Sequence, residues 1–186
     1  SSGGSDLARR IAWAETLPTE GIDTHLDELT YLLAMEMGKA WQEAMGDVLK
    51  VNEVVEFAAG APHLMKGESL MQVSPGYDTV QYHHPIGVFA GIAPWNFPAM
   101  IPHGWMTPIC IATGNCMILK AASFVPQSSM RMMELWQEAG LPDGVLNVFT
   151  AGREQAEILL EVGTDRRLAL LQQSIDVFAQ TRYRQR

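Results

Sequence analysis

The chain has 186 residues, and its 47% apolar and 18% charged composition is typical of one globular domain with a sizeable core. Its net charge of −8 argues against a nucleic-acid surface, which needs clustered Lys and Arg. The longest apolar run, residues 99–113, is interrupted by Pro102 and Pro108 and is too short to span a bilayer.

The first half of the chain carries two amphipathic patterns. Apolar residues at helical spacing predict helices over residues 25–38 and 41–60, each ending at a glycine. A turn-rich link over 61–69 follows. The polar stretch DTVQYHHP at 78–85 is typical of an edge strand or a projecting arm.

From residue 87 the pattern changes to short apolar strands alternating with helices. Strands are predicted over 87–93, 115–122 and 145–149, and helices over 99–114, 125–140 and 153–161. In the helix at 125–140, the spacing of Met130, Met133 and Trp136 indicates core packing. Short connections between buried strands favour parallel pairing. The predicted fold is therefore α/β: a partial doubly wound parallel sheet preceded by amphipathic helices.

Two polar residues follow the ends of these strands. Asn96 lies just past the first strand, between Pro94 and Pro98, and Lys120 lies at the end of the second. Ligands of such sheets bind at the carboxyl ends of the strands. Both residues are therefore candidate binding residues, although Asn96 could instead satisfy backbone groups in a tight turn.

Three stretches together carry a family resemblance: GIAPWNFPAMIP (91–102), GNCMILKAAS (114–123) and AGLPDGVLNV (139–148). In this combination the sequence resembles the aldehyde dehydrogenase superfamily, over about residues 26–161. The stretch EVVEFAAGAPHLMKGE (53–68) is most similar to the CoA-acylating branch, which contains methylmalonate-semialdehyde dehydrogenase. The resemblance implies that the sheet is the incomplete NAD-binding domain of this family.

The resemblance also implies roles for the candidate residues. Asn96 matches the asparagine whose amide donates to the developing oxyanion, a contribution of about 3–4 kcal/mol at such sites. Lys120 matches the lysine that reaches the adenosine ribose. Ser123 replaces a family glutamate that holds both ribose hydroxyls, so NAD is expected and NADP is not excluded.

The backbone next to Asn96 has an implied role as well. By resemblance it lines the nicotinamide side of the cofactor site, and its residues are Ile92, Ala93, Pro94 and Trp95.

The charge changes sign near the C-terminus. There are 8 basic and 19 acidic residues before residue 162, and 5 basic and 2 acidic residues from there on. The later family motifs, which supply the nucleophilic cysteine, are not in this stretch. We therefore expect a poorly defined segment at 1–24, a partial coenzyme-binding domain at 25–161 and a non-family basic tail at 162–186. Three parallel strands would leave the sheet with an open edge.

The two cysteines, Cys110 and Cys116, lie in apolar surroundings. They make no disulfide framework, and the N-terminus has no signal-peptide pattern, so we expect a cytoplasmic location. Both read as core residues with raised pKa rather than as the nucleophile. His103, Cys110 and Cys116 have no recognised ligand spacing, so no metal site is expected.

By resemblance, the intact relative would oxidise a small semialdehyde to an acyl-CoA with NAD, with CoA as co-substrate, and would be a homo-oligomer. This chain alone is expected to be inactive. One alternative is a plain aldehyde dehydrogenase that uses water instead of CoA. Another is a non-catalytic fragment that acts by self-association or by dinucleotide binding.

Overall fold

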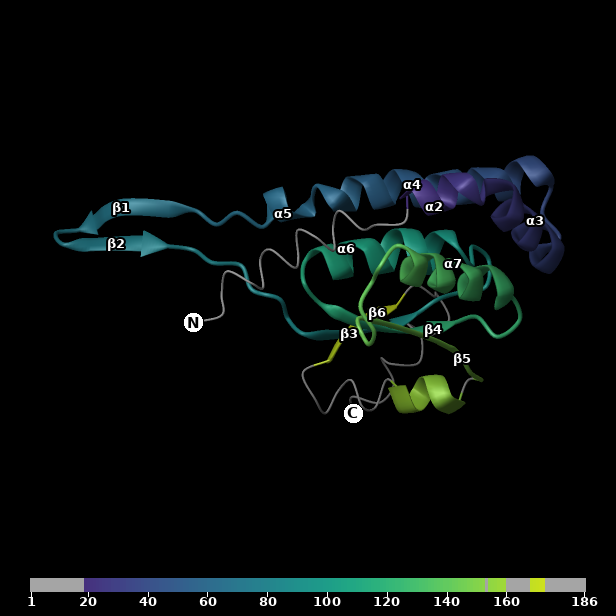
Figure 1. The fold of residues 1–186 in the computed structure, drawn as a ribbon. Coiled ribbons are helices and arrows are strands. Elements are labelled where there is room, and N and C mark those ends of the chain that lie inside the picture. Colours follow the sequence, from purple (N-terminus) through teal and green to yellow (C-terminus); the bar gives the residue numbers. More distant parts are fainter. Residues whose placement is uncertain (1–18, 153, 160–167, 173–186) are drawn as a thin grey trace.

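The computed structural model describes residues 19–152, 154–159 and 168–172 (Figure 1). The helices are α2 (Thr19–Thr24), α3 (Leu26–Met37), α4 (Trp41–Ala59), α5 (Ala61–Leu64), the π-helix η1 (Met100–Met106), α6 (Thr107–Ala112), α7 (Gln127–Glu138) and one over residues 154–159. The strands are β1 (Ser69–Ser74), β2 (Tyr77–Val80), β3 (Val88–Ile92), β4 (Cys116–Ala121), β5 (Leu146–Thr150) and β6 (Leu168–Gln172). None of these helices is long and apolar enough to cross a membrane.

Strands β3 to β6 form one parallel sheet in the order β5-β4-β3-β6. Helices η1, α6 and α7 cover one face of this sheet, and the helix at 154–159 lies on the other (Figure 1). The chain thus leaves β3 in one direction across the sheet, through β4 and β5, and returns to the far side of β3 through β6. This reversal is the doubly wound pattern, and the predicted fold class is confirmed.

Strand β6 is the main departure from the predicted sheet. It pairs with β3 in parallel register, from Val88 opposite Leu168 to Ile92 opposite Gln172. The sheet therefore has four strands, and its edges among the described residues are β5 and β6. The strand falls within residues 162–186, and the rest of that range lies outside the described residues. A short apolar run such as LALLQ has no periodicity that identifies a strand, so only its pairing reveals it.

Helices α3 and α4 pack on the layer formed by η1, α6 and α7. Their buried side chains have the predicted helical spacing: Leu29, Leu33, Val48, Val51, Val55 and Ala58. Helix α7 differs from the prediction, because Met130 is 40% exposed whereas Met132 and Trp136 are fully buried. The buried stripe of α7 runs through Ser128, Met132 and Trp136, which leaves Met130 on another face.

The helix predicted over 99–114 divides into η1 and α6. The Thr107 N–H donates to the carbonyl of Pro102, five residues back, and the Thr107 hydroxyl donates to the same oxygen at 2.7 Å. Pro108 has no N–H, so the α-helical ladder cannot run through this point unbroken. Gly104 lets η1 approach α4 closely, since a Cβ there would lie 3.3 Å from Val51 Cα.

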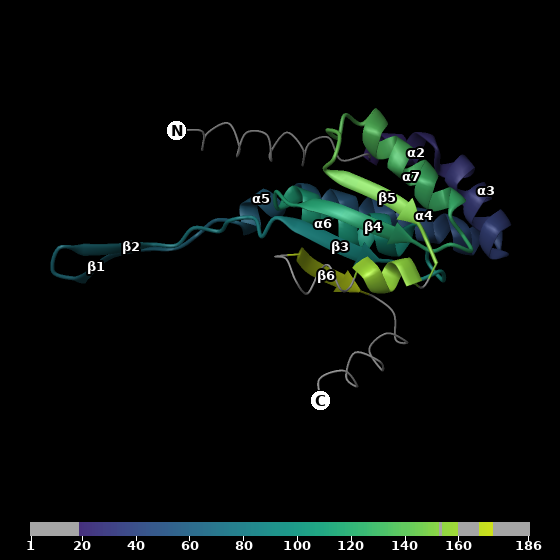
Figure 2. The same ribbon diagram turned by 90° about the horizontal axis from the view of Figure 1, so that it is seen from below.

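Strands β1 and β2 form an antiparallel hairpin that projects well away from the sheet (Figures 1 and 2). Every residue of both strands is exposed, including Leu70, Met71 and Tyr77. The arm interpretation of this region agrees with the structure. The hairpin buries none of its own apolar side chains, so those side chains are available to other surfaces.

Substitution of Leu33 tests the packing of α3. Leu33 is fully buried, so Leu33→Ala should lower the free energy of unfolding by about 2–5 kcal/mol. Leu64, which is 67% exposed, provides a matched control, and Leu64→Ala should change stability by less than about 0.5 kcal/mol. Urea denaturation followed by circular dichroism measures both. Equal losses would contradict the observed packing of α3.

Candidate functional site

The loop after β3 leaves the sheet at a defined point. The Ala93 N–H donates to the Lys120 carbonyl at 3.0 Å, so the β3–β4 ladder extends one residue beyond Ile92. Pro94 then has no N–H to continue the ladder. The Ile101 N–H donates to the Phe97 carbonyl at 3.1 Å, which begins the turn into η1. The loop is thus fixed at both ends and holds Asn96 near the centre of the carboxyl edge.

Asn96 is exposed at this edge. Its side-chain amide makes no hydrogen bond with any residue in the described ranges, so within those ranges it does not satisfy the backbone of the turn. The neighbouring Pro94 and Pro98 restrict the backbone instead. An amide that is held in place and has an unused N–H can donate to a ligand.

The four residues before Asn96 divide into two pairs. Ile92 and Ala93 are buried, at 8% and 5% exposure, so only their backbone faces the carboxyl edge. Pro94 is half-buried, and Trp95 is 60% exposed with its indole at the surface. The structure therefore places this predicted cofactor-binding segment at the carboxyl edge, and within it only Trp95 presents a large side chain to solvent.

Lys120 lies opposite Ile92 in the parallel register, at the same edge as Asn96. Partial burial lowers the pKa of its ammonium group, because the charged form is less well solvated there. No carboxylate among the described residues forms an ion pair with it. The charge of Lys120 is thus available to an anionic or hydroxylated ligand.

Ser123 is exposed in the loop after β4, but its hydroxyl is already used. Its Oγ donates to the Ala151 carbonyl at 2.6 Å, and this bond ties the loop to the segment that follows β5. The oxygen keeps its acceptor capacity. Ser123 can therefore accept a hydrogen bond from a ligand hydroxyl while it holds the loop.

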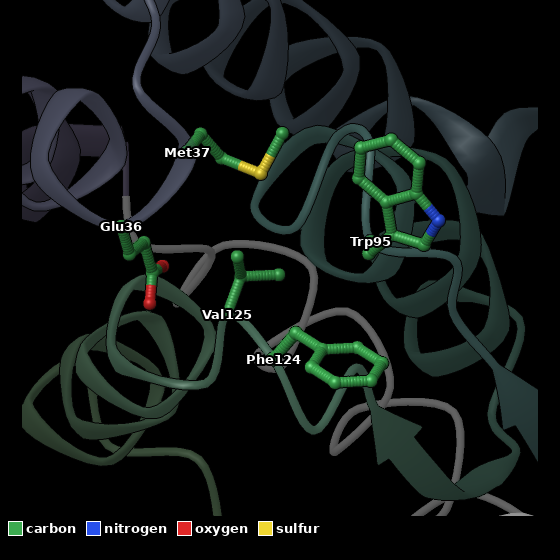
Figure 3. Close-up of a pocket in the computed structure, with 5 residues that line it drawn as sticks. All are labelled: Glu36, Met37, Trp95, Phe124 and Val125. Carbon is green, nitrogen blue, oxygen red and sulfur yellow. The ribbon is translucent and has the colours of Figure 1, made fainter.

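A cavity of about 370 Å³ opens beside these loops (Figure 3). Its walls come from three elements: the end of α3, the loop after β3 and the loop after β4. The lining residues are Glu36, Met37, Trp95, Phe124 and Val125. Of these, sequence reasoning identified only Trp95. Nothing in their spacing along the chain links α3 to the later loops, so no sequence signal could have found the others.

Neither cysteine lies at this edge. Cys116 begins β4, at the opposite end of the strand from Lys120, and Cys110 is buried in α6. Burial, together with the nearby Cys116, raises the pKa of the Cys110 thiol to about 12. Cys110 is thus a core residue, as expected, whereas Cys116 is only half-buried. That Cys110 is unreactive stays a prediction.

His103 is also a core residue. It is fully buried, and its Nε2 lies 2.8 Å from the Ser129 hydroxyl. Burial lowers the pKa of the imidazole to about 3, although the contact with Ser129 opposes this shift. Among the described residues no group of three His, Cys, Asp or Glu side chains could hold a metal ion.

Comparison with known proteins identifies the family. The model of the aldehyde dehydrogenase family matches residues 7–170, a wider span than the region of about residues 26–161 over which the motifs carry the resemblance. Malonate-semialdehyde dehydrogenase 2 of Geobacillus kaustophilus (strain HTA426) is 47% identical over 137 residues. The malonate-semialdehyde dehydrogenase of Bacillus pumilus (strain SAFR-032) is 47% identical over 135 residues.

Solved structures of similar proteins include members of the same family. Methylmalonate-semialdehyde dehydrogenase from Oceanimonas doudoroffii has 43% identity and a TM-score of 0.77, over 82% of this chain and 31% of that one. A Sinorhizobium meliloti 1021 protein assigned as methylmalonate-semialdehyde dehydrogenase, solved with NAD, has 38% identity and a TM-score of 0.78, over 83% of this chain and 31% of that one.

The coverage of the relatives is unequal. The residues that match the Geobacillus relative make up 74% of this chain but only 28% of that protein. Those that match the Bacillus pumilus relative make up 73% of this chain and 28% of that protein. The chain thus spans less than a third of the length of the curated relatives that it matches. It corresponds to one part of those proteins.

Thiol labelling tests the assignment of Cys110 to the core. With a pKa of about 12, roughly one Cys110 thiol in ten thousand is ionised at pH 8. In a Cys116→Ser variant, Ellman's reagent should therefore label the folded protein far more slowly than the urea-unfolded protein. The reciprocal Cys110→Ser variant leaves the half-buried Cys116 and should be labelled faster. Equal labelling of folded and unfolded Cys116→Ser protein would contradict the assignment.

Proposed function

This chain belongs to the aldehyde dehydrogenase family, and from that premise we propose that the carboxyl edge of its sheet binds NAD as part of a semialdehyde dehydrogenase. The observation that carries the proposal is the shared edge: Asn96, in the loop after β3, and Lys120, near the end of the adjacent β4, lie at the same end of the sheet, and within the described residues neither side chain has a hydrogen-bond or ion-pair partner. This is the position at which doubly wound sheets bind nucleotides. The Sinorhizobium relative that was solved with NAD supports the same cofactor.

Each residue has a distinct part in the proposal. Lys120 donates to the adenosine ribose, and Ser123 accepts from one ribose hydroxyl. The backbone from Ile92 to Trp95 lies along the nicotinamide. Because Ser123 is neutral where the family glutamate would be charged, it repels a 2′-phosphate less, so discrimination against NADP is weak.

In the intact enzyme the proposed substrate is a small semialdehyde such as malonate or methylmalonate semialdehyde, which the names of the relatives support. A cysteine thiolate adds to the aldehyde carbon, and Asn96 donates a hydrogen bond to the oxyanion that forms. When bound, NAD would supply the acceptor for the hydride of this carbon. The acyl group of the resulting thioester would then pass to the sulfur of CoA, whose thiol proton goes to a base, and the enzyme cysteine would leave as thiolate. Transfer to water instead of CoA is the alternative within the same family.

A second candidate function is association. The hairpin of β1 and β2 projects from the sheet with every strand residue exposed, Leu70 and Tyr77 among them (Figure 2). We propose that the intact protein is a homo-oligomer and that this chain self-associates through its exposed apolar surface. Size-exclusion chromatography with light scattering tests this, and a monomer at high protein concentration that binds no hydrophobic dye would contradict it.

Substitution of Lys120 tests the cofactor site. Lys120→Ala removes a charge-assisted donor, so the Kd for NAD should rise roughly tenfold. Lys66→Ala removes an exposed lysine from the link before β1 and should leave the Kd unchanged. Isothermal titration calorimetry measures both variants against the unsubstituted chain. Equal Kd values for all three proteins would contradict the assignment of Lys120.

A second prediction concerns turnover. Residues 1–186 alone should bind NAD but should not reduce it when a semialdehyde and CoA are supplied, because neither Cys110 nor Cys116 lies at the carboxyl edge. NADH absorbance measures the reaction. Steady NADH formation by the purified chain that survives Cys110→Ala would contradict both the proposed inactivity and the roles given to these residues.

A further inference from the structure

The end of α3 and the turn that follows it, residues 36–39, contact both loops at the carboxyl edge of the sheet. The first residue of this segment, Glu36, reaches the beginning of α7, and its last, Lys39, reaches the loop after β3. The turn itself is well defined, because Gly38 has a left-handed conformation with φ of 70° and its N–H donates to the Ala34 carbonyl at 2.9 Å. The segment 36–39 lies outside both loops, yet it contacts each of them.

Glu36 contacts the backbone amides at the start of α7. The Gln127 N–H donates to Oε2 at 2.8 Å, and the Ser128 N–H donates to Oε1 at 2.9 Å. The Ser128 hydroxyl also donates to Oε1. The first amides of a helix have no partner within it, and a carboxylate satisfies them and the positive end of the helix dipole together. The residue that directly precedes α7, Pro126, has no side-chain bond that caps the helix.

Lys39 makes the matching contact on the other loop. Its ammonium lies 4.0 Å from the centre of the Phe97 ring and forms an ion pair with Asp47 of α4. Both partners of this ion pair are largely shielded, with side-chain exposures of 16% and 11%. Phe97 is the residue directly after Asn96. The ammonium is thus held by α4 and in turn supports the loop that carries Asn96.

The loop after β4 is therefore held from two sides. Ser123 donates to the Ala151 carbonyl, which fixes the loop to the end of β5. Glu36 fixes its other end, where the loop enters α7. Glu36 also lines the cavity together with Trp95 and Phe124, one residue from each loop (Figure 3). The Glu36 carboxylate is therefore placed so that loss of its bonds to α7 would alter the distance between the loop after β3 and the loop after β4.

We propose that Glu36 is a positioning residue for the cofactor site: by holding the start of α7, it sets the distance between the loop after β4, which carries Ser123, and the loop after β3, which carries Asn96. The inference rests on the proposed function, since it concerns affinity for the same dinucleotide. Glu36 itself touches no cofactor in this scheme. It acts through the loop, and Lys39 holds the opposite loop against the same turn.

A double substitution separates positioning from helix capping. Pro126 precedes α7 with helical dihedral angles, φ −86° and ψ −24°, so a side chain at Val125 is the one placed to cap the helix locally. Val125→Thr adds a hydroxyl of similar shape there. In a Glu36→Ala background it should return the capping bond to α7 without restoring the link to α3.

The proposal predicts different behaviour for stability and for affinity. Glu36→Ala should lower the Tm and raise the Kd for NAD roughly tenfold. Because Val125 lines the cavity, the double variant is compared with Val125→Thr alone: Glu36→Ala with Val125→Thr should recover most of the Tm that Glu36→Ala loses, while its Kd stays raised above that of Val125→Thr. Glu36→Gln keeps one acceptor oxygen and should restore part of the affinity. The exposed Glu53, substituted by Ala, is the control and should change neither quantity. Recovery of the Kd together with the Tm, or no change in Kd for Glu36→Ala, would overturn the proposal.

A measurement without cofactor keeps this test separate from the proposed function. Amide chemical shifts of the unliganded Glu36→Ala, Val125→Thr protein should differ from those of Val125→Thr at residues 120–124 and 95–97. Glu36→Gln, the milder variant, gives the same comparison if the alanine variant does not fold. If the unsubstituted chain binds no NAD, the proposed function fails and the shifts alone decide the positioning role. Shift changes confined to residues 125–128 would overturn it.

Discussion

The hydrogen bond from the Ala93 N–H to the Lys120 carbonyl is the constraint on which the carboxyl edge depends. It is the last rung of the parallel β3–β4 ladder, and Pro94 ends the ladder immediately after it. The β3–β4 pairing therefore ends at the same level on both strands. Because of this, Asn96, three positions past Ala93, and Lys120, near the end of β4, lie at the same edge of the sheet, although they are 24 positions apart in the sequence.

The surrounding layers keep this edge in place. On one side, η1 follows the Asn96 loop directly and packs closely on α4 through Gly104. On the other, β6 pairs with β3 and completes the point at which the strand order reverses. The helix layer and the added strand thus fix β3 from both sides. The loop after β3 therefore has rigid elements on both sides and carries an exposed amide, that of Asn96, which suits a binding site.

The sequence predicts this edge well and its supports poorly. Asn96 and Lys120 could be placed because parallel strands end at a common edge, so strand ends alone locate them. Glu36 could not, because its bonds to Gln127 and Ser128 depend on how α3 packs on α7. Met130 was misplaced because several apolar residues of α7 fit a helical spacing and only packing selects the buried set. Strand β6 has too short an apolar run to be recognised without its partner.

Titration of the isotope-labelled chain with NAD, followed by amide chemical shifts, shows whether the carboxyl edge of β3 and β4 binds the dinucleotide. Binding at this edge should produce saturable shifts at residues 92–97, apart from Pro94, and at 120–124, with the hairpin of β1 and β2 unchanged. Shifts that are absent at both loops, or that cluster on the hairpin or at the opposite end of the sheet near Cys116, would contradict it.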